Sequence, residues 1–378
     1  MSIELAKAAL HDAATWWSGK IRDSWVPSYL DERGLRIAAL SHGAGWAPAG
    51  WNTTVQHLAN LGYSDQTLLD AGLAVRASTG RLIDVFRDRM VLPIHHNGDL
   101  VGFLGRVNPA DQDNQPKWVN SPNSPVYDKS AVLYGYSAEK IAAGAMPVLV
   151  EGPLDVLALS TISHDVAIAP MAPCGTALTT TQINTLVADL APDQPIAVCF
   201  DGDDAGQRAT LAAWVGFTGQ FEQWQAPPLL HVSMPAQQDP ADLVQAGNQT
   251  LLKQCLVRAE PLPSVVADIT IAQAGALDHV GRQVAVLRHF VGTDLAYVHR
   301  SNLGRYLLGL ERKLDLLEHD TVLTEAMERI SPTGTTDALS AKLGANRAHP
   351  RAGGLASSPS SPGTAKTHHA SREHMPER

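Results

Sequence analysis

The feature that most constrains the fold is an alternation of apolar runs and amphipathic stretches in the middle of the chain. From residue 146 onward, strand-like segments such as PVLVEG, PIAVCFDGD and LLHVSMP alternate with helix-like segments such as PLDVLALS, TTTQINTLVADL and AGQRATLAAWVGF. Continuous apolar strands separated by helices indicate a mostly parallel sheet that is covered by helices on both faces. We therefore predict an α/β domain over residues 146–260.

The residues before this domain have a different pattern. Residues 1–23 predict a helix that carries Trp16 and Trp17 on its apolar side. Residues 24–145 contain short strand-like runs, among them MVLPIHH and LVGFLGRV, separated by turn-forming pairs such as Asn-Gly and Asn-Pro. Short strands joined by such turns predict an α+β subdomain.

The residues after the α/β domain divide into two parts. Residues 261–330 have helical periodicity, most clearly in LGRYLLGLERKLDLLEHD, and predict a C-terminal helical subdomain. Residues 331–378 are rich in Ser, Pro, Gly, Ala and Thr and contain no aromatic residue. A segment of this composition cannot bury enough apolar surface to fold, so we predict a disordered tail.

Composition excludes several classes of protein. No apolar run approaches the roughly 20 residues that a membrane span needs, and the N-terminus carries Glu4 and Asp12 where a secretory signal would be basic and then apolar. We therefore expect a cytoplasmic protein without a membrane partner. The 3 cysteines are far apart and form no CxxC pair, so neither a zinc site nor a disulfide framework is expected.

Acidic residues follow three strands of the predicted sheet. Glu151 follows MPVLV, Asp201 and Asp203 follow PIAVCF, and Asp239 and Asp242 come after LLHVSMP. In a parallel α/β sheet these strand ends meet at one edge, where like charges raise each other's pKa unless cations lie between them. Carboxylate oxygens suit Mg²⁺, and two such ions about 3.5–4 Å apart can activate a 3′-hydroxyl and stabilise a leaving pyrophosphate.

Helix capping is the competing interpretation for several of these carboxylates. Asp204 is followed by a glutamine three residues later, which has the form of a capping box, so we expect Asp204 to cap a helix. Asp155 and Asp239 also stand at good helix starts. A calcium loop of the EF-hand type is excluded, because Ala205 and Ala212 would occupy two of its ligand positions.

The motifs VLVEGPLDVLAL, GTALT and CFDGDDAGQRA, in this order and spacing, resemble the TOPRIM module of bacterial DnaG-type primases. The resemblance implies acid/base or metal chemistry for Glu151 and divalent-ion binding for Asp201 and Asp203. Asp155 matches the family's aspartate in the first motif and is carried over as a further metal residue.

The segment DPADLV is similar to the third acidic element of the family, which often reads DPD. Ala241 occupies the third place of that element, and Asp242 comes one residue later. Asp239 is therefore carried over as a metal ligand, whereas Asp242 is not.

The resemblance extends upstream through YLDERGL, FRDRMVLPI, VGFLGRV and PKWVNSPNSPVYDKSAVLYGY, which are similar to blocks of the primase N-terminal polymerase subdomain. It implies that basic and polar side chains in these blocks contact the template and the incoming nucleotide. Ser121 would support them, Arg89 is a weaker candidate, and Trp118 stands where the family usually has Tyr and can stack on a base. The residues carried over are Arg87, Arg106, Lys117, Asn120 and Lys129.

The resemblance implies a DNA-dependent RNA polymerase that makes short primers from ribonucleoside triphosphates on a single-stranded DNA template, with Mg²⁺ or Mn²⁺ and no zinc. We expect no counterpart of the family's N-terminal zinc-binding domain, since the first 23 residues contain no cysteine. A replicative helicase, a separate zinc-domain protein or a relaxase is the kind of recruiting partner that this implies.

Two alternatives stay open on the sequence alone. TOPRIM modules also serve metal-dependent nucleases and strand-passage enzymes, although Gly19-Lys20 is followed by Ile21 and forms no ATP-binding P-loop. A non-catalytic single-strand-binding protein of a mobile element is the other alternative.

Overall fold

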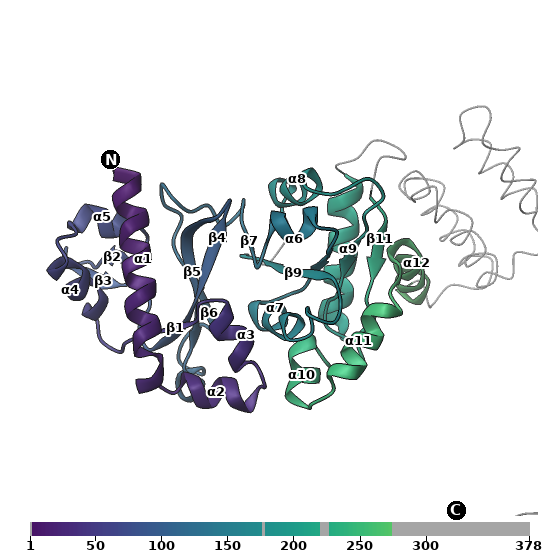
Figure 1. Ribbon diagram of the computed structural model, residues 1–378, viewed down its shortest axis with the longest axis horizontal. Coiled ribbons are helices and arrows are strands. Elements are labelled where there is room, and N and C mark those ends of the chain that lie inside the picture. Colours follow the sequence, from purple (N-terminus) through teal and green to yellow (C-terminus); the bar gives the residue numbers. More distant parts are fainter. Residues whose placement is uncertain (1, 176–177, 220–226, 274–378) are drawn as a thin grey trace, which may run out of the picture. The chain divides into compact units, whose positions relative to one another are not determined.

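The computed structural model describes residues 2–175, 178–219 and 227–273, which build two main sheets and their flanking helices (Figure 1). The predicted disordered tail and most of the predicted helical subdomain lie outside these residues. Only α12 (Leu262–Gln273) of the helical subdomain is described. None of the described helices has the length and apolar character needed to cross a membrane.

The first part of the chain is α+β, as predicted. Its strands are β1 (Gly45–Ala47), β2 (Ala74–Arg76), β3 (Leu82–Asp84), β4 (Arg89–His96), β5 (Asp99–Val107) and β6 (Trp118–Asn120). Its helices are α1 (Ser2–Lys20), α2 (Val26–Glu32), α3 (Arg36–Ser41), α4 (Thr53–Asn60) and α5 (Asp65–Asp70), with 3₁₀ turns at Ile21–Asp23 and Pro109–Asp111.

The predicted N-terminal helix is α1. Its buried positions, Ala6, Ala9, Leu10, Ala13 and Trp17, recur at three- and four-residue spacing and form one apolar stripe. This stripe packs on the core beneath the first sheet, where the Trp17 ring makes an edge contact with a phenylalanine of β5.

The first sheet is antiparallel, with the order β1-β4-β5-β6. The hairpin between β4 and β5 turns at Asn97 and Gly98, both of which have positive φ angles, 51° and 85°. A two-residue turn of this kind matches the right-handed twist of the strands it joins. The Asn-Gly turn predicted from the sequence is confirmed.

The second sheet is mostly parallel, also as predicted. Its order is β12-β11-β10-β8-β9-β7, with the four central strands parallel and both edge strands antiparallel. Its strands are β7 (Leu133–Tyr134), β8 (Met146–Leu149), β9 (Ile168–Pro173), β10 (Ile196–Val198), β11 (Leu229–His231) and β12 (Glu260–Pro261). Its helices are α6 (Ala138–Ala142), α7 (Pro153–Ser160), α8 (Thr180–Ala188), α9 (Asp204–Thr218), α10 (Pro240–Gln245) and α11 (Gln249–Val257).

Both faces of the second sheet are buried. Val148 and Val150 belong to the cluster that contains the apolar residues of α7, whereas Leu149 belongs to the cluster that contains those of α8, α9 and α12. Successive strand residues point to opposite faces, so this alternation shows helices on both sides. The first of these clusters also includes Tyr29 and Leu92, so it continues into the first part of the chain.

Candidate active site

Three neighbouring parallel strands deliver the predicted acidic residues to one edge of the second sheet. β8, β10 and β11 lie side by side, with β10 between the other two. Glu151 follows β8, Asp201 follows β10, and Asp239 follows β11. The first two are in direct contact, because the backbone N–H of Asp201 donates to Oε1 of Glu151 at 3.2 Å. The convergence predicted from the strand order is therefore present.

The electrostatics centre on Asp201. Its half-buried position raises its pKa to about 7, and the charges of Glu151, Asp239, Asp203 and Asp242 add to the shift. Partial desolvation also raises the pKa of Glu151 and of Asp239. For all three carboxyl groups the pKa stays above its ordinary value, which is the condition that a bound metal ion would relieve.

Asp203 caps helix α9. Its Oδ1 accepts hydrogen bonds from the backbone N–H groups of Ala205 and Gly206, both at 2.8 Å. The prediction that Asp204 is the cap is wrong by one residue. Asp203 has extended backbone angles, φ −130° and ψ −176°, which let its side chain turn back over the first helical turn. Asp204 is already the first helical residue and is exposed.

The start of α9 also needs a glycine. A Cβ atom on Gly206 would lie 2.0 Å from the backbone carbonyl oxygen of Asp201. Asp201 and the first turn of α9 therefore approach each other more closely than any side-chain-bearing residue at position 206 would allow. This contact holds the loop that carries Asp201 against the helix that Asp203 caps.

Asp239 caps helix α10, which confirms its interpretation as a helix start. Its Oδ1 accepts from the backbone N–H of Asp242 at 2.6 Å, and Oδ2 of Asp242 accepts in return from the N–H of Asp239 at 3.3 Å. This reciprocal pair is a capping box. Asp242 is thereby bound to its own helix start, and its charge still contributes to the raised pKa of Asp201.

Asp155 lies inside the rim, with 6% of its surface exposed. Its Oδ2 accepts from the N–H of Gly152 at 3.2 Å, and its Oδ1 accepts from the N–H of Ala241 at 3.4 Å. Burial raises its pKa well above the usual range, and Asp239 and Asp201 raise it further. The side chain therefore joins the turn after Glu151 to the start of α10.

The acidic residues have the ligand atoms that a hard divalent cation prefers, but their side chains are not arranged around a common point. Carboxylate oxygens are the ligands that Mg²⁺ prefers. Within the residues that the structure describes, no three His, Cys, Asp or Glu side chains lie close enough to form a ready-made metal site. The carboxyl groups nevertheless raise one another's pKa, and ion binding would require their side chains to turn toward a common point.

Positive charges approach the acidic rim from the first part of the chain. Arg33, which follows α2, and Lys117, which precedes β6, both oppose the elevated pKa of Asp239. Arg33 also lies over the ring of Tyr29, 5.1 Å from its centroid. Lys117 is one of the predicted residues, whereas Arg33 was not predicted, although it stands within the YLDERGL block that carries the resemblance.

Arg106 is buried between two aromatic rings. Its guanidinium carbon lies 5.9 Å from the centroid of Tyr29 and 5.8 Å from that of Trp118. Its Nε and Nη1 have no hydrogen-bond partner in the described part of the chain, and only 3% of the residue is exposed. Cation–π contact with the two rings compensates in part for this burial.

The remaining predicted residues have varied surroundings. Arg89 is buried and donates to the carbonyl oxygens of Gly105 and Pro116, so it supports the first sheet. Nδ2 of Asn120 donates to the carbonyl oxygen of Cys174, which ties β6 to the end of β9. Arg87 is half-buried, Lys129 is exposed, and Oγ of Ser121 accepts from the N–H of Phe103 at 3.0 Å.

Comparison with known proteins identifies the family. A model of the DNA primase catalytic core, N-terminal domain, matches residues 20–140, and a Toprim-like model matches residues 148–243. DNA primase of Neisseria meningitidis serogroup A is 31% identical over 297 residues, which cover 75% of this chain and 48% of that protein. DNA primase of Streptomyces coelicolor is 35% identical over 289 residues, which cover 71% and 44%. This chain carries the catalytic core of DnaG-type primases.

Solved structures agree with this membership. The RNA polymerase domain of Mycobacterium tuberculosis primase DnaG is 29% identical, with a TM-score of 0.68, and the match covers 81% of this chain and 98% of that domain. A DnaG primase catalytic domain bound to single-stranded DNA is 25% identical with a TM-score of 0.67. The chain spans about half the length of the curated primases it matches.

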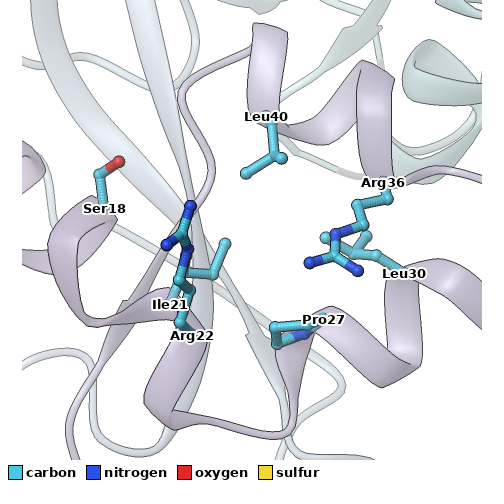
Figure 2. Close-up of a pocket in the computed structure, with 7 residues that line it drawn as sticks. All are labelled: Ser18, Ile21, Arg22, Pro27, Leu30, Arg36 and Leu40. Carbon is cyan, nitrogen blue, oxygen red and sulfur yellow. The ribbon is translucent and has the colours of Figure 1, made fainter.

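A cavity of about 230 Å³ in the first part of this primase core is separate from the acidic rim (Figure 2). It lies among α1, the 3₁₀ turn that follows it, α2 and α3, and the side chains of Arg22 and Arg36 extend toward it. Its lining contains no carboxylate, so it offers no metal site. The lining residues are Ser18, Ile21, Arg22, Pro27, Leu30, Arg36 and Leu40.

Proposed function

We propose that this primase core synthesises short RNA primers on single-stranded DNA by metal-dependent nucleotidyl transfer. The observation that carries the proposal is the acidic rim of Glu151, Asp201 and Asp239, with the charges of Arg33 and Lys117 acting on Asp239. Acidic side chains that repel one another hold cations, and a basic wall opposite them holds the phosphates that those cations also bind. Phosphoryl transfer needs both, because its catalysis is mainly positioning and charge stabilisation.

The acidic residues would divide the chemistry among them. A divalent ion, Mg²⁺ or Mn²⁺, held by Asp201, Asp203 and Asp239 would neutralise charge on the triphosphate and lower the pKa of the attacking 3′-hydroxyl. Glu151 has a raised pKa and is held by the N–H of Asp201, so it is suited to accept the proton of that hydroxyl. Asp201, with a pKa of about 7 before the ion binds, would release its proton to admit the ion.

Asp155 has a positioning role in this proposal. Both of its oxygens accept backbone hydrogen bonds, and its burial keeps it behind the exposed rim. It sets the spacing between Glu151 and Asp239 by joining the segments that follow them. It would therefore support the metal-binding residues without itself being the primary ligand.

The basic wall would bind the substrates. Lys117 and Arg33 would contact the triphosphate, because the charges of both already act on the carboxyl group of Asp239, a proposed metal ligand. Trp118 would stack on a base, since Arg106 supports its ring from beneath. Lys129 and Arg87 would contact template phosphates, and Asn120 would hold β6 against the end of β9. We expect this activity in the cytoplasm, with a helicase, a zinc-domain protein or a relaxase as the recruiting partner.

The test is extension of an RNA primer annealed to a single-stranded DNA template, with labelled ribonucleotides and Mg²⁺ or Mn²⁺. A supplied primer removes the initiation step, for which the relatives' other domains could be needed. Wild type should add nucleotides, Glu151→Ala and Asp201→Ala should not, and the exposed neighbour variant Asp204→Ala should retain activity. Template degradation by wild type that is lost in the same two variants would instead establish a metal-dependent nuclease.

A further inference from the structure

Tyr29 of α2 lies among three other side chains of the first part of the chain. The guanidinium carbon of Arg33 lies 5.1 Å from the centroid of its ring, and that of Arg106 lies 5.9 Å from the same centroid. The ring of Trp25 makes an edge contact with it, at a centroid distance of 5.5 Å. Tyr29 is only 7% exposed. Its ring is therefore a buried surface that contacts two cations.

The ring of Tyr29, and not its hydroxyl group, makes these contacts. The hydroxyl is buried and has no hydrogen-bond partner among the residues that the structure describes. A buried hydroxyl without a partner destabilises a fold, so its removal in a phenylalanine variant should cost no stability. Tyr29→Phe and a variant without a ring therefore separate the two parts of the side chain.

A carboxylate fixes the tryptophan that packs against Tyr29. Oδ1 of Asp88 accepts hydrogen bonds from the indole N–H groups of Trp25 and Trp46, at 3.0 and 2.9 Å. Its Oδ2 accepts from Nδ2 of Asn108 at 2.9 Å. The backbone N–H of Tyr29 donates to the carbonyl oxygen of Trp25 at 3.2 Å. The Tyr29 ring is thus held in one position at the start of α2.

Arg33 contacts this ring in place of a carboxylate. Tyr29 and Arg33 are four residues apart, a spacing that brings side chains together on one face of a helix. The Arg33 guanidinium makes no hydrogen bond or ion pair within the described part of the chain. Arg36, by contrast, donates to Oδ2 of Asp31 at 2.6 Å. Contact with a ring orients a guanidinium and leaves its N–H groups available to an anion.

The charge of Arg33 acts at the acidic rim. Burial raises the pKa of Asp239, and the charges of Arg33 and Lys117 oppose this rise. We propose that Tyr29 is a positioning residue that holds the Arg33 guanidinium beside the acidic rim for contact with the triphosphate. The proposal rests on the proposed function, because it takes the triphosphate to be the ligand of Arg33. In this role Tyr29 acts through Arg33 and does not contact the substrate.

The experiment measures primer extension by the full chain with Tyr29 replaced in two ways. Tyr29→Leu removes the ring, so it should raise KM for ribonucleotides about fivefold and leave kcat within about twofold of wild type. Tyr29→Phe keeps the ring and should have the KM of wild type. Phe103→Leu, which truncates a fully buried ring in the core beneath the first sheet, is the matched control and should not change KM. Circular dichroism of each variant checks that it is folded.

A double-mutant cycle separates positioning from a general loss of structure. In the Arg33→Ala background, Tyr29→Leu should change KM by less than about twofold, because the residue through which it acts is absent. The full effect of Tyr29→Leu in that background overturns the proposal. An unchanged KM in a folded Tyr29→Leu chain, or the same increase in Tyr29→Phe or Phe103→Leu, overturns it as well.

Binding of a fluorescent ATP analogue with Mg²⁺, measured by anisotropy without primer or template, is read separately from extension. If wild type binds the analogue, and Tyr29→Leu weakens binding while Tyr29→Phe does not, the positioning role stands even where wild type adds no nucleotide and the polymerase function fails. If wild type extends the primer and Tyr29→Leu changes neither KM nor binding, the function stands and the positioning role fails. Absence of binding by wild type overturns both.

Discussion

Removal of one charge from the acidic rim should stabilise the metal-free protein. Asp201→Asn keeps the shape of the side chain and removes a charge that partial burial disfavours and that four neighbouring carboxylates oppose. An increase of the pKa from 3.8 to about 7 corresponds to about 4 kcal/mol between the ionised and neutral forms. Solvent screening around a half-buried group reduces this energy difference, so we expect the free energy of unfolding of Asp201→Asn to exceed that of wild type by about 1–2 kcal/mol.

The pH dependence follows from the direction of the shift. A carboxyl group whose pKa is raised by folding contributes stability below its unfolded pKa, and that contribution is lost as the pH rises through its folded pKa. For Asp201 this interval runs from 3.8 to about 7. The Asn variant lacks the titration, so its advantage over wild type should be small near the lower limit and complete at about pH 8.

Urea unfolding of both proteins in EDTA measures this difference, with Asp113→Asn, a change at an exposed loop carboxylate, as the control. Addition of millimolar Mg²⁺ should stabilise wild type more than the Asn variant, because only wild type keeps the full ligand set. Our account of the rim would be refuted if Asp201→Asn were no more stable than wild type at alkaline pH in EDTA. An equal Mg²⁺ response in the two proteins would refute Asp201 as a ligand.

Three further predictions test other parts of the site. Gly206→Ala should lower the free energy of unfolding by about 1–3 kcal/mol, because the added Cβ meets the Asp201 carbonyl; a stabilised variant in urea unfolding would contradict the contact. Asp155→Ala should destabilise the fold by about 1–3 kcal/mol through two unsatisfied N–H groups, and Asp155→Asn, which keeps the acceptor oxygen, should lose less. Lys117→Ala should raise KM for ribonucleotides about tenfold in primer extension, as expected for loss of a charged contact of about 1.4 kcal/mol; an unchanged KM would remove Lys117 from the nucleotide site.

Local sequence pattern was sufficient for the α+β and α/β parts of the architecture and for the position of the acidic rim. The backbone geometry of helices and strands imposes distinct apolar periods on the local sequence, so the α/β alternation could be predicted, as could the Asn97–Gly98 turn from its residue types. The carboxyl ends of adjacent parallel strands must share an edge, so the sequence alone predicts that Glu151 and Asp201 lie close together. The contact between them bears this out.

Only the tertiary structure decided which side chains act together. The backbone is extended at Asp203 and helical from Asp204 onward, so Asp203 and not Asp204 caps α9. The position of this boundary depends on the packing of α9 against the loop that carries Asp201. The burial of Arg106 between Tyr29 and Trp118 joins segments that are distant in the sequence. The sequence gives the type of ionisable group at each position. The surrounding packing determines how far that group is solvated and which partners it has, and these two factors set its pKa and its possible role.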